Sequence, residues 1–257
     1  MSLRAHNITV GHTPGDSLLT DIDLTIPAGS VVGLTGPSGS GKTTLARVLA
    51  GLHPPSAGTV TVDGLPLTQP SRWRNRGQRS IAMLFPSPRQ ATSPRWTLER
   101  IIAEPLAVTG TPAGQWARTV HTTALRVGLT ADLLHRQPHQ VSDGQLQRAC
   151  LARALIQRPR YLICDEMTAM LDPATTATLV HVLTEEADAT LGILAVSHDH
   201  QLLHAWADTV IDLPELVPRA GIRSRCEQPT RSPALPSSRR PRRSRHNCPD
   251  GRMISRS

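Results

Sequence analysis

The sequence predicts an α/β protein built around a parallel β-sheet, and two observations carry that prediction. Short runs of β-branched and other apolar residues have the length and composition of buried strands, and helix-compatible segments separate them along the chain. Strands that alternate with helices are typical of parallel sheets covered by helices. With 257 residues, 39% of them apolar, the chain can bury the core of one large domain.

The first strand is expected at residues 30–35, where SVVGLT is apolar throughout and is followed by glycine. A helix is expected at residues 43–52, because its apolar side chains recur three and four positions apart. Residues 97–158 are largely helical in pattern, and a further helix is expected at 174–187. The other strands are expected at residues 58–64, 81–85, 161–166 and 192–198.

The charge of the chain is concentrated near its C-terminal end. The net charge is +8, but residues 1–213 contain 17 basic and 17 acidic side chains, whereas residues 214–257 contain 11 arginines and three acidic residues. The body therefore lacks the basic excess of a nucleic-acid-binding surface, and we expect no specific nucleic-acid partner. The segment 214–257 is rich in Arg, Pro and Ser, which predicts a disordered tail behind a domain spanning 1–213.

The first twelve residues lack the apolar core of a signal peptide, and no run approaches the roughly 18 apolar residues of a membrane span. The four cysteines have no close spacing of the kind that binds a metal, and Cys150 and Cys164 lie in apolar segments typical of a core. These observations favour a cytosolic protein that contacts a membrane only through a partner.

A glycine-rich loop follows the first strand and has the form G-x-x-x-x-G-K-T. Between a strand and a helix this pattern predicts a P-loop, in which backbone N–H groups and the helix N-terminus bind the phosphates of a nucleotide such as ATP. Glycine permits the tight curl of such a loop because it has no Cβ. The residues expected to bind nucleotide are Gly36, Pro37, Ser38, Gly39, Ser40, Gly41, Lys42, Thr43 and Thr44.

Lys42 is the only lysine among 28 basic residues, and the other 27 are arginine. Its position in the loop explains the exception, because an ammonium is a compact point charge that can reach the β- and γ-phosphates, whereas a planar guanidinium is too wide for the same turn. The hydroxyl of Thr43 is expected to bind Mg²⁺.

Two carboxylates, Asp165 and Glu166, end the strand at 161–166. Asp165 is placed to hold Mg²⁺, and Glu166 is placed to polarise a water for attack on the γ-phosphate. His198 follows the strand at 192–198. Because parallel α/β sheets bind ligands at the carboxyl ends of their strands, we expect His198 to contact the γ-phosphate rather than to be structural.

The segment VSDGQLQRACLARAL, residues 141–155, resembles the signature segment L-S-G-G-Q of ABC-transporter ATPases. The acid pair follows it, then MLD at 170–172, which resembles the D-loop with Asp172, and then the switch-like His198. The resemblance covers residues 3–213. It implies a RecA-like P-loop NTPase fold, in which a parallel core sheet is joined by an N-terminal antiparallel β part and an α-helical subdomain is inserted at about residues 90–158.

The family resemblance also implies a dimer with two ATP sites, each between the P-loop of one subunit and the signature segment of the other. Ser142, Gly144 and Gln145 would then contact the partner's nucleotide, with Ser142 capping a helix that begins at Asp143. Residues 93–106, SPRWTLERIIAEPL, resemble the N-P-R-x-T-V and E-P-L stretches of dipeptide, oligopeptide and nickel importer ATPases. This implies a peripheral subunit on the cytoplasmic face of the cell membrane that works with permeases and, indirectly, a solute-binding protein.

Three positions depart from the family pattern. Pro86 stands where members usually carry a glutamine that senses Mg²⁺ and water, and Gln90 is the nearest possible substitute. Asp143 replaces the first signature glycine, and its charge would be favourable at a helix start but repulsive near a γ-phosphate. His12 falls where an aromatic residue usually stacks on adenine.

The leading interpretation is an ATP-hydrolysing importer subunit. Pro86 and Asp143 keep open a degenerate cassette that serves mainly as the structural half of a pair. A soluble ABC ATPase acting on ribosomes or DNA is a further alternative, and the signature segment argues against a P-loop kinase. Because Pro86 affects the subunit's own site and Asp143 the partner's site, we expect a heterodimer with a second ATPase.

Overall fold

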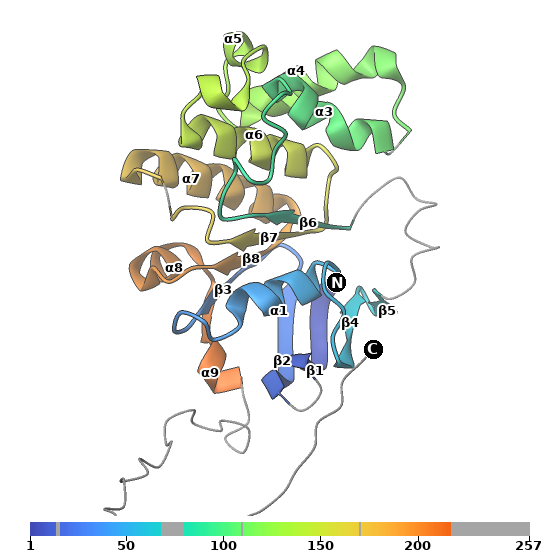
Figure 1. Cartoon of the computed structure of the whole chain (residues 1–257), viewed down its shortest axis with the longest axis vertical. Coiled ribbons are helices and arrows are strands. Elements are labelled where there is room, and N and C mark those ends of the chain that lie inside the picture. Colours follow the sequence, from blue (N-terminus) through green and yellow to red (C-terminus); the bar gives the residue numbers. More distant parts are fainter. Residues whose placement is uncertain (14–15, 68–79, 109, 170, 217–257) are drawn as a thin grey trace, which may run out of the picture. The chain divides into compact units, whose positions relative to one another are not determined.

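A computed structural model of the chain describes residues 1–13, 16–67, 80–108, 110–169 and 171–216 (Figure 1). All of them lie within Met1–Ile222, the first of two units into which the chain divides. The tail from residue 217 onward lies outside the described residues, so its predicted disorder stays a prediction. Within the described ranges, none of the helices combines the length and the apolar character needed to cross a membrane.

A five-stranded parallel sheet forms the centre of the described unit, as the sequence predicted, with strand order β6-β7-β8-β3-β9. The strands β3, β7 and β8 are buried along their whole length, which explains their uninterrupted apolar sequences. The strand bounds are β3 Val31–Thr35, β6 Ile81–Leu84, β7 Tyr161–Asp165, β8 Gly192–Val196 and β9 Thr209–Asp212.

A four-stranded antiparallel sheet with the order β2-β1-β4-β5 confirms the N-terminal β part that the family resemblance implied. The hydroxyl of Tyr161 in β7 donates a hydrogen bond to Asp63 Oδ1 at 2.7 Å, which ties the turn after β4 to the parallel sheet. The strand bounds are β1 Ser2–Thr13, β2 Asp16–Pro27, β4 Ala57–Val62 and β5 Leu65–Pro66.

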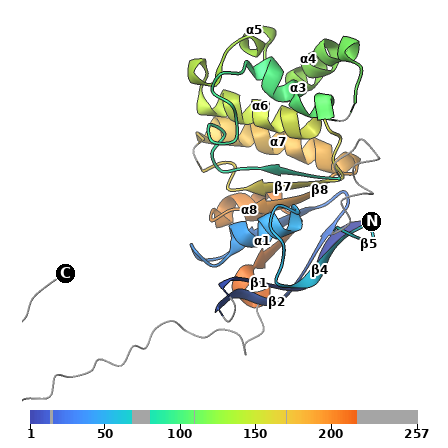
Figure 2. The same ribbon diagram turned by 45° about the vertical axis from the view of Figure 1, so that its right-hand side comes forward.

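The helices lie on both faces of the parallel sheet (Figures 1 and 2). The helix α1 packs with the antiparallel sheet in one hydrophobic core, and α3, α6 and α7 contribute to a second core on the other face. The bounds are α1 Lys42–Leu49, α3 Leu98–Val108, η1 Ala113–Gln115, α4 Trp116–Arg126, α5 Ala131–Leu134, η2 Pro138–Gln140, α6 Asp143–Leu155, α7 Pro173–Ala189, α8 His200–Trp206 and α9 Leu213–Leu216.

The strand β7 contributes side chains to both hydrophobic cores. Tyr161 and Ile163 point into the core that contains α1, whereas Leu162 and Cys164 point into the core that contains α6 and α7. Successive side chains of a strand face opposite sides, so a strand with a helix layer on each face has no polar side. Burial raises the pKa of Cys150, which faces the α6 side of the core, to about 11, so this thiol stays protonated at neutral pH.

The structure corrects several element boundaries. The helix α1 ends at Leu49 rather than residue 52, because Gly51 turns the chain with φ +70°. The segment 200–212, for which the sequence pattern predicted no element, forms α8 and the edge strand β9. Helix α9 begins at Leu213, which is 1% exposed and packs in the core that contains α1 and the antiparallel sheet.

Candidate functional site

The P-loop connects β3 to α1, the context that the sequence predicted. Gly36 and Gly41 have φ values of +144° and +102°, which residues with a side chain rarely adopt. A Cβ on Gly41 would also lie 3.0 Å from the side chain of Leu19. The hydroxyl of Ser40 is buried and accepts or donates no hydrogen bond among the described residues. The loop therefore fits a phosphate group that supplies the missing hydrogen-bond partner.

The side chain of Lys42 curls back over this loop. Its Nζ donates hydrogen bonds of 2.8 Å to the carbonyl oxygens of Gly36 and Pro37, and the residue is only 6% exposed. These two carbonyls hold the ammonium at the start of α1, where the helix dipole also favours a negative ligand. The site thus brings together a fixed positive charge and the backbone N–H groups of a helix N-terminus.

The two residues expected to bind Mg²⁺ are in contact. Thr43 Oγ1 donates a hydrogen bond of 3.1 Å to Asp165 Oδ1, which joins the first turn of α1 to the end of β7. Asp165 is fully buried, and its Oδ2 has no hydrogen-bond partner in the described part of the chain. Burial raises the pKa of Asp165, and the hydrogen bond from Thr43 opposes that shift. A buried carboxylate beside a threonine hydroxyl fits an oxygen-preferring cation such as Mg²⁺.

Glu166 and His198 face each other at the ends of neighbouring strands. Glu166 has a left-handed backbone, with φ +45°, and its N–H donates to the carbonyl oxygen of Val196 at 2.9 Å. This conformation is strained for a side chain other than glycine and is held here by the β7–β8 pairing. Glu166 Oε1 lies 3.7 Å from His198 Nδ1, so the two predicted catalytic groups belong to one cluster.

The signature segment, residues 141–155, contains helix α6, which begins at Asp143 as predicted. Ser142 caps the helix and accepts a hydrogen bond of 3.2 Å from the N–H of Gln145, and Gln145 Oε1 accepts one of 3.0 Å from the N–H of Ser142. This capping box uses Oε1 of Gln145 and leaves the hydroxyl proton of Ser142 and the side-chain NH2 group of Gln145 outside that interaction. Ser142 is exposed, so the segment is accessible to a second molecule.

The first turns of α6 and α7 adjoin at Gly144. A Cβ on Gly144 would lie 2.7 Å from Cγ2 of Thr175, which leaves no space for any side chain there. Thr175 is in turn fixed by Asp172, which caps α7 by accepting hydrogen bonds from the N–H and the hydroxyl of Thr175 at 2.9 and 2.6 Å. These hydrogen bonds lower the pKa of Asp172. Asp172, the predicted D-loop residue, therefore holds Thr175 against the first turn of α6.

Replacing Gly144 with alanine is expected to force α6 and α7 apart. We expect the free energy of unfolding to fall by about 1–3 kcal/mol, as for other overpacked sites. Adding Thr175→Ser to Gly144→Ala removes the clashing methyl while keeping the hydroxyl that Asp172 accepts, and should restore most of the loss. Urea denaturation of the two single variants and the double variant measures this, and an unchanged stability in Gly144→Ala would contradict the packing argument.

Three residues named from the sequence are not brought into the site by any described contact. Pro86 is half-buried after β6, and Gln90, the nearest possible substitute for the missing glutamine, is exposed on the following turn. His12 lies in β1, but its side chain is outside the described part of the structure, and its contact with adenine stays a prediction.

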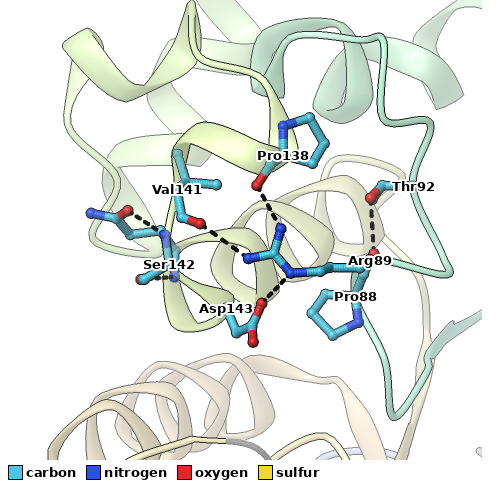
Figure 3. Close-up of polar contacts among 8 residues, drawn as sticks. Pro88, Arg89, Thr92, Pro138, Val141, Ser142 and Asp143 are labelled. Atoms are coloured by element: carbon cyan, nitrogen blue, oxygen red, sulfur yellow. Dashed lines mark hydrogen bonds and ion pairs between the residues drawn. The ribbon is translucent and has the colours of Figure 1, made fainter.

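Sequence reasoning missed two residues of the site. Thr175 was detectable in principle, because Asp172-x-x-Thr175 has the spacing of a helix cap. Arg89 was not, although an aspartate in place of a glycine called for a positive partner. The structure places Arg89 Nε 2.7 Å from Asp143 Oδ1, across 54 positions of sequence that no local pattern connects (Figure 3).

Comparisons with known proteins identify the family of the chain. The family profile described as ABC transporter matches residues 19–169. The nickel import ATP-binding protein NikE of Rhodospirillum rubrum is 39% identical over 210 residues, which cover 80% of this chain and 76% of that protein. The oligopeptide transport ATP-binding protein OppF of Haemophilus influenzae is 35% identical over 196 residues, 74% of this chain, and the match spans only 59% of that protein.

A solved structure shows the same fold. The dimeric structure of MJ0796, a bacterial ABC transporter cassette, superposes with a TM-score of 0.72 at 24% sequence identity, and the match covers 82% of this chain and 93% of that one.

Proposed function

The chain belongs to the ABC transporter family of ATP-binding proteins, and on that premise we propose that it is the ATP-hydrolysing subunit of an importer. One observation carries the proposal. Three groups meet at the carboxyl ends of the neighbouring strands β3, β7 and β8: the P-loop with Lys42, the pair Asp165 and Glu166, and His198. This is the edge where parallel α/β sheets bind their ligands.

The residues of this cluster divide the work of hydrolysis. Lys42 and the loop amides bind the phosphates, while Thr43 and Asp165 would hold Mg²⁺, which neutralises phosphate charge when bound. Glu166 accepts the proton of the attacking water. His198, 3.7 Å from Glu166, orients that carboxylate and donates toward the γ-phosphate oxygens.

ATPases of this family work as dimers, and the signature segment completes the partner's site in our proposal. Ser142, Gly144 and Gln145 lie at the start of α6, a 13-residue helix whose N-terminal N–H groups suit a γ-phosphate presented by another subunit. We favour a heterodimer with a second ABC ATPase, since Pro86 removes a glutamine from this chain's own site that a partner subunit can retain in the other.

We place the permease contact on the groove lined by β6, α3, α6 and the segment that follows α1, which has a volume of about 550 Å³. Its rim carries Leu52 and Val108, which are 57% and 72% exposed, beside the half-buried Met83. Exposed apolar side chains around a concave surface favour an apolar segment of another protein. The assembly would lie on the cytoplasmic face of the cell membrane and receive its solute from a binding protein.

We propose peptides, nickel or a related small solute as the transported substrate, on the basis of the relatives alone. Nickel and oligopeptides are named for the two relatives above, and nothing in an ATP site distinguishes these solutes, because they bind to other subunits. Pro86 favours one second candidate, a degenerate cassette that binds ATP but serves mainly as the structural half of a pair.

The complex provides the test. Alone, the chain is expected to stay monomeric with ATP and to show little turnover, whereas the chain co-purified with its partner ATPase and permeases should hydrolyse ATP. Crosslinking of Ser142→Cys to the P-loop of each candidate subunit would identify the pairing. Robust ATP-driven homodimers with full activity would contradict the heterodimer, and an assembled complex that binds ATP without turnover would support the degenerate cassette.

A further inference from the structure

Arg89 lies on a compact turn between β6 and α3. The turn is closed by a hydrogen bond from the N–H of Ala91 to the carbonyl of Ser87 at 3.2 Å and by one from Thr92 Oγ1 to the carbonyl of Pro88 at 2.9 Å. Figure 3 shows the Arg89 side chain extending from this turn to the segment before helix α6. The base of the side chain is thus fixed, which reduces the entropy lost when its far end makes contacts.

All three guanidinium nitrogens of Arg89 contact that segment. One terminal nitrogen donates to the carbonyl oxygen of Pro138 at 2.9 Å, the other donates to that of Val141 at 3.3 Å, and Nε lies 2.7 Å from Asp143 Oδ1 (Figure 3). The two carbonyl contacts fix the plane of the guanidinium. Only a side chain with donors in three directions can make this set of contacts.

Asp143 is the first residue of α6, the position where its charge matters most. Its Oδ1 is buried and accepts no hydrogen bond from the described residues, so the Arg89 guanidinium is the positive group that balances it. Helical side chains lean toward the helix N-terminus, so a released Asp143 carboxylate would project past the start of α6. Any anion bound in front of this helix would then face a negative charge.

We propose that Arg89 is a positioning residue that draws the Asp143 carboxylate aside and neutralises it, so that the signature segment can receive the triphosphate of the partner subunit. The inference rests on the proposed function, because it assumes that α6 faces a nucleotide in the dimer. The aspartate is compatible with phosphate binding because an arginine from a different part of the chain offsets its charge.

The test uses ATP turnover by the assembled complex of this chain, its ATPase partner and the permeases. Arg89→Ala should raise the ATP concentration for half-maximal turnover about tenfold, the effect of about 1.4 kcal/mol of added repulsion. Asp143→Gly alone should change it less than about threefold, and the double variant Arg89→Ala with Asp143→Gly should return to that level, because no charge is left to offset.

Arg89→Lys separates charge from the carbonyl contacts. A lysine keeps the positive charge but cannot make the forked contacts, so turnover should stay within about threefold of the unchanged chain. The matched control is Arg126→Ala, which breaks an ion pair of similar exposure with Glu186, between the C-terminal parts of α4 and α7. Glu186 lies about three helical turns beyond Thr175, the residue of α7 that meets the start of α6, so this loss should have no effect.

The inference is overturned if the double variant is as impaired as Arg89→Ala, or if Arg89→Lys is as impaired as Arg89→Ala. Either result would mean that Arg89 acts by holding the backbone of the signature segment and not by its charge. These outcomes leave the proposed function intact. If the complex without any substitution bound no ATP, the proposed function would be overturned, and this inference with it.

Discussion

Replacing Lys42 with alanine is expected to reduce ATP turnover of the assembled complex by at least about 10²-fold, the effect of removing one fixed charge-stabilising group from an active site. Lys42 is 6% exposed and its ammonium donates hydrogen bonds of 2.8 Å to two loop carbonyls, and the loop contains no other basic side chain that could supply the charge. Both ATP hydrolysis and ATP binding should fall. Turnover at saturating ATP measures the first, and the binding of a fluorescent ATP analogue measures the second.

Lys42→Arg gives the sharper form of this experiment. The pocket formed by the carbonyls of Gly36 and Pro37 accommodates a single nitrogen, and a planar guanidinium would displace one of them. We therefore expect the arginine variant to fail as well, in a chain that uses arginine for every other basic residue except histidine. Arg136→Ala, which removes an exposed charge paired with Asp132, is the control and should retain full activity. An active arginine variant would refute the geometric argument.

Replacing Glu166 with glutamine is expected to separate binding from hydrolysis. Glutamine has nearly the same shape but cannot accept the proton of water, so turnover should fall by at least about 10²-fold. ATP binding should change less than about twofold, because it depends on Lys42, Thr43 and Asp165 rather than on this carboxylate. The variant should accumulate as an ATP-bound dimer, which sedimentation or size-exclusion chromatography detects.

Glu185→Gln provides the matched control for that experiment. Glu185 is an exposed carboxylate on α7, 67% accessible and paired only with His181 among the described residues, so its loss should leave turnover unchanged. Normal hydrolysis by Glu166→Gln in the assembled complex would show that another group accepts the proton. Loss of ATP binding in the same variant would show instead that the strained turn at Glu166 shapes the nucleotide site.

The P-loop, the buried strand and the start of α6 were predictable because each depends on residues that are close together in the sequence. Gly36 and Gly41 mark the P-loop, since few other residues adopt their backbone angles. The run YLICD marks a strand buried on both faces, and Ser142 with Gln145 marks a helix start. In each case the sequence signal and its physical cause lie within a few residues of each other, so the fold class, and the expectation of a nucleotide site, followed from the sequence.

The edge elements were missed for a different reason. The strand β9 and the short helices α8 and α9 have weak local patterns, and they form because β9 pairs with β3 and because Leu203 and Leu213 fill the two cores. Tertiary packing supplies what local propensity lacks.

The sequence by itself determined which residues we expect at the ATP site. Only the tertiary structure decided the surroundings of two residues in the signature segment, Asp143 and Gly144. Asp143 could have been a helix cap or an obstacle to phosphate, and its direction depends on Arg89, whose turn packs beside it only in the folded chain. Gly144 could have been a flexible residue, but it is required by the 2.7 Å approach of Thr175. Charge balance and steric exclusion act through space, between residues that are distant along the chain, so no local pattern can encode them.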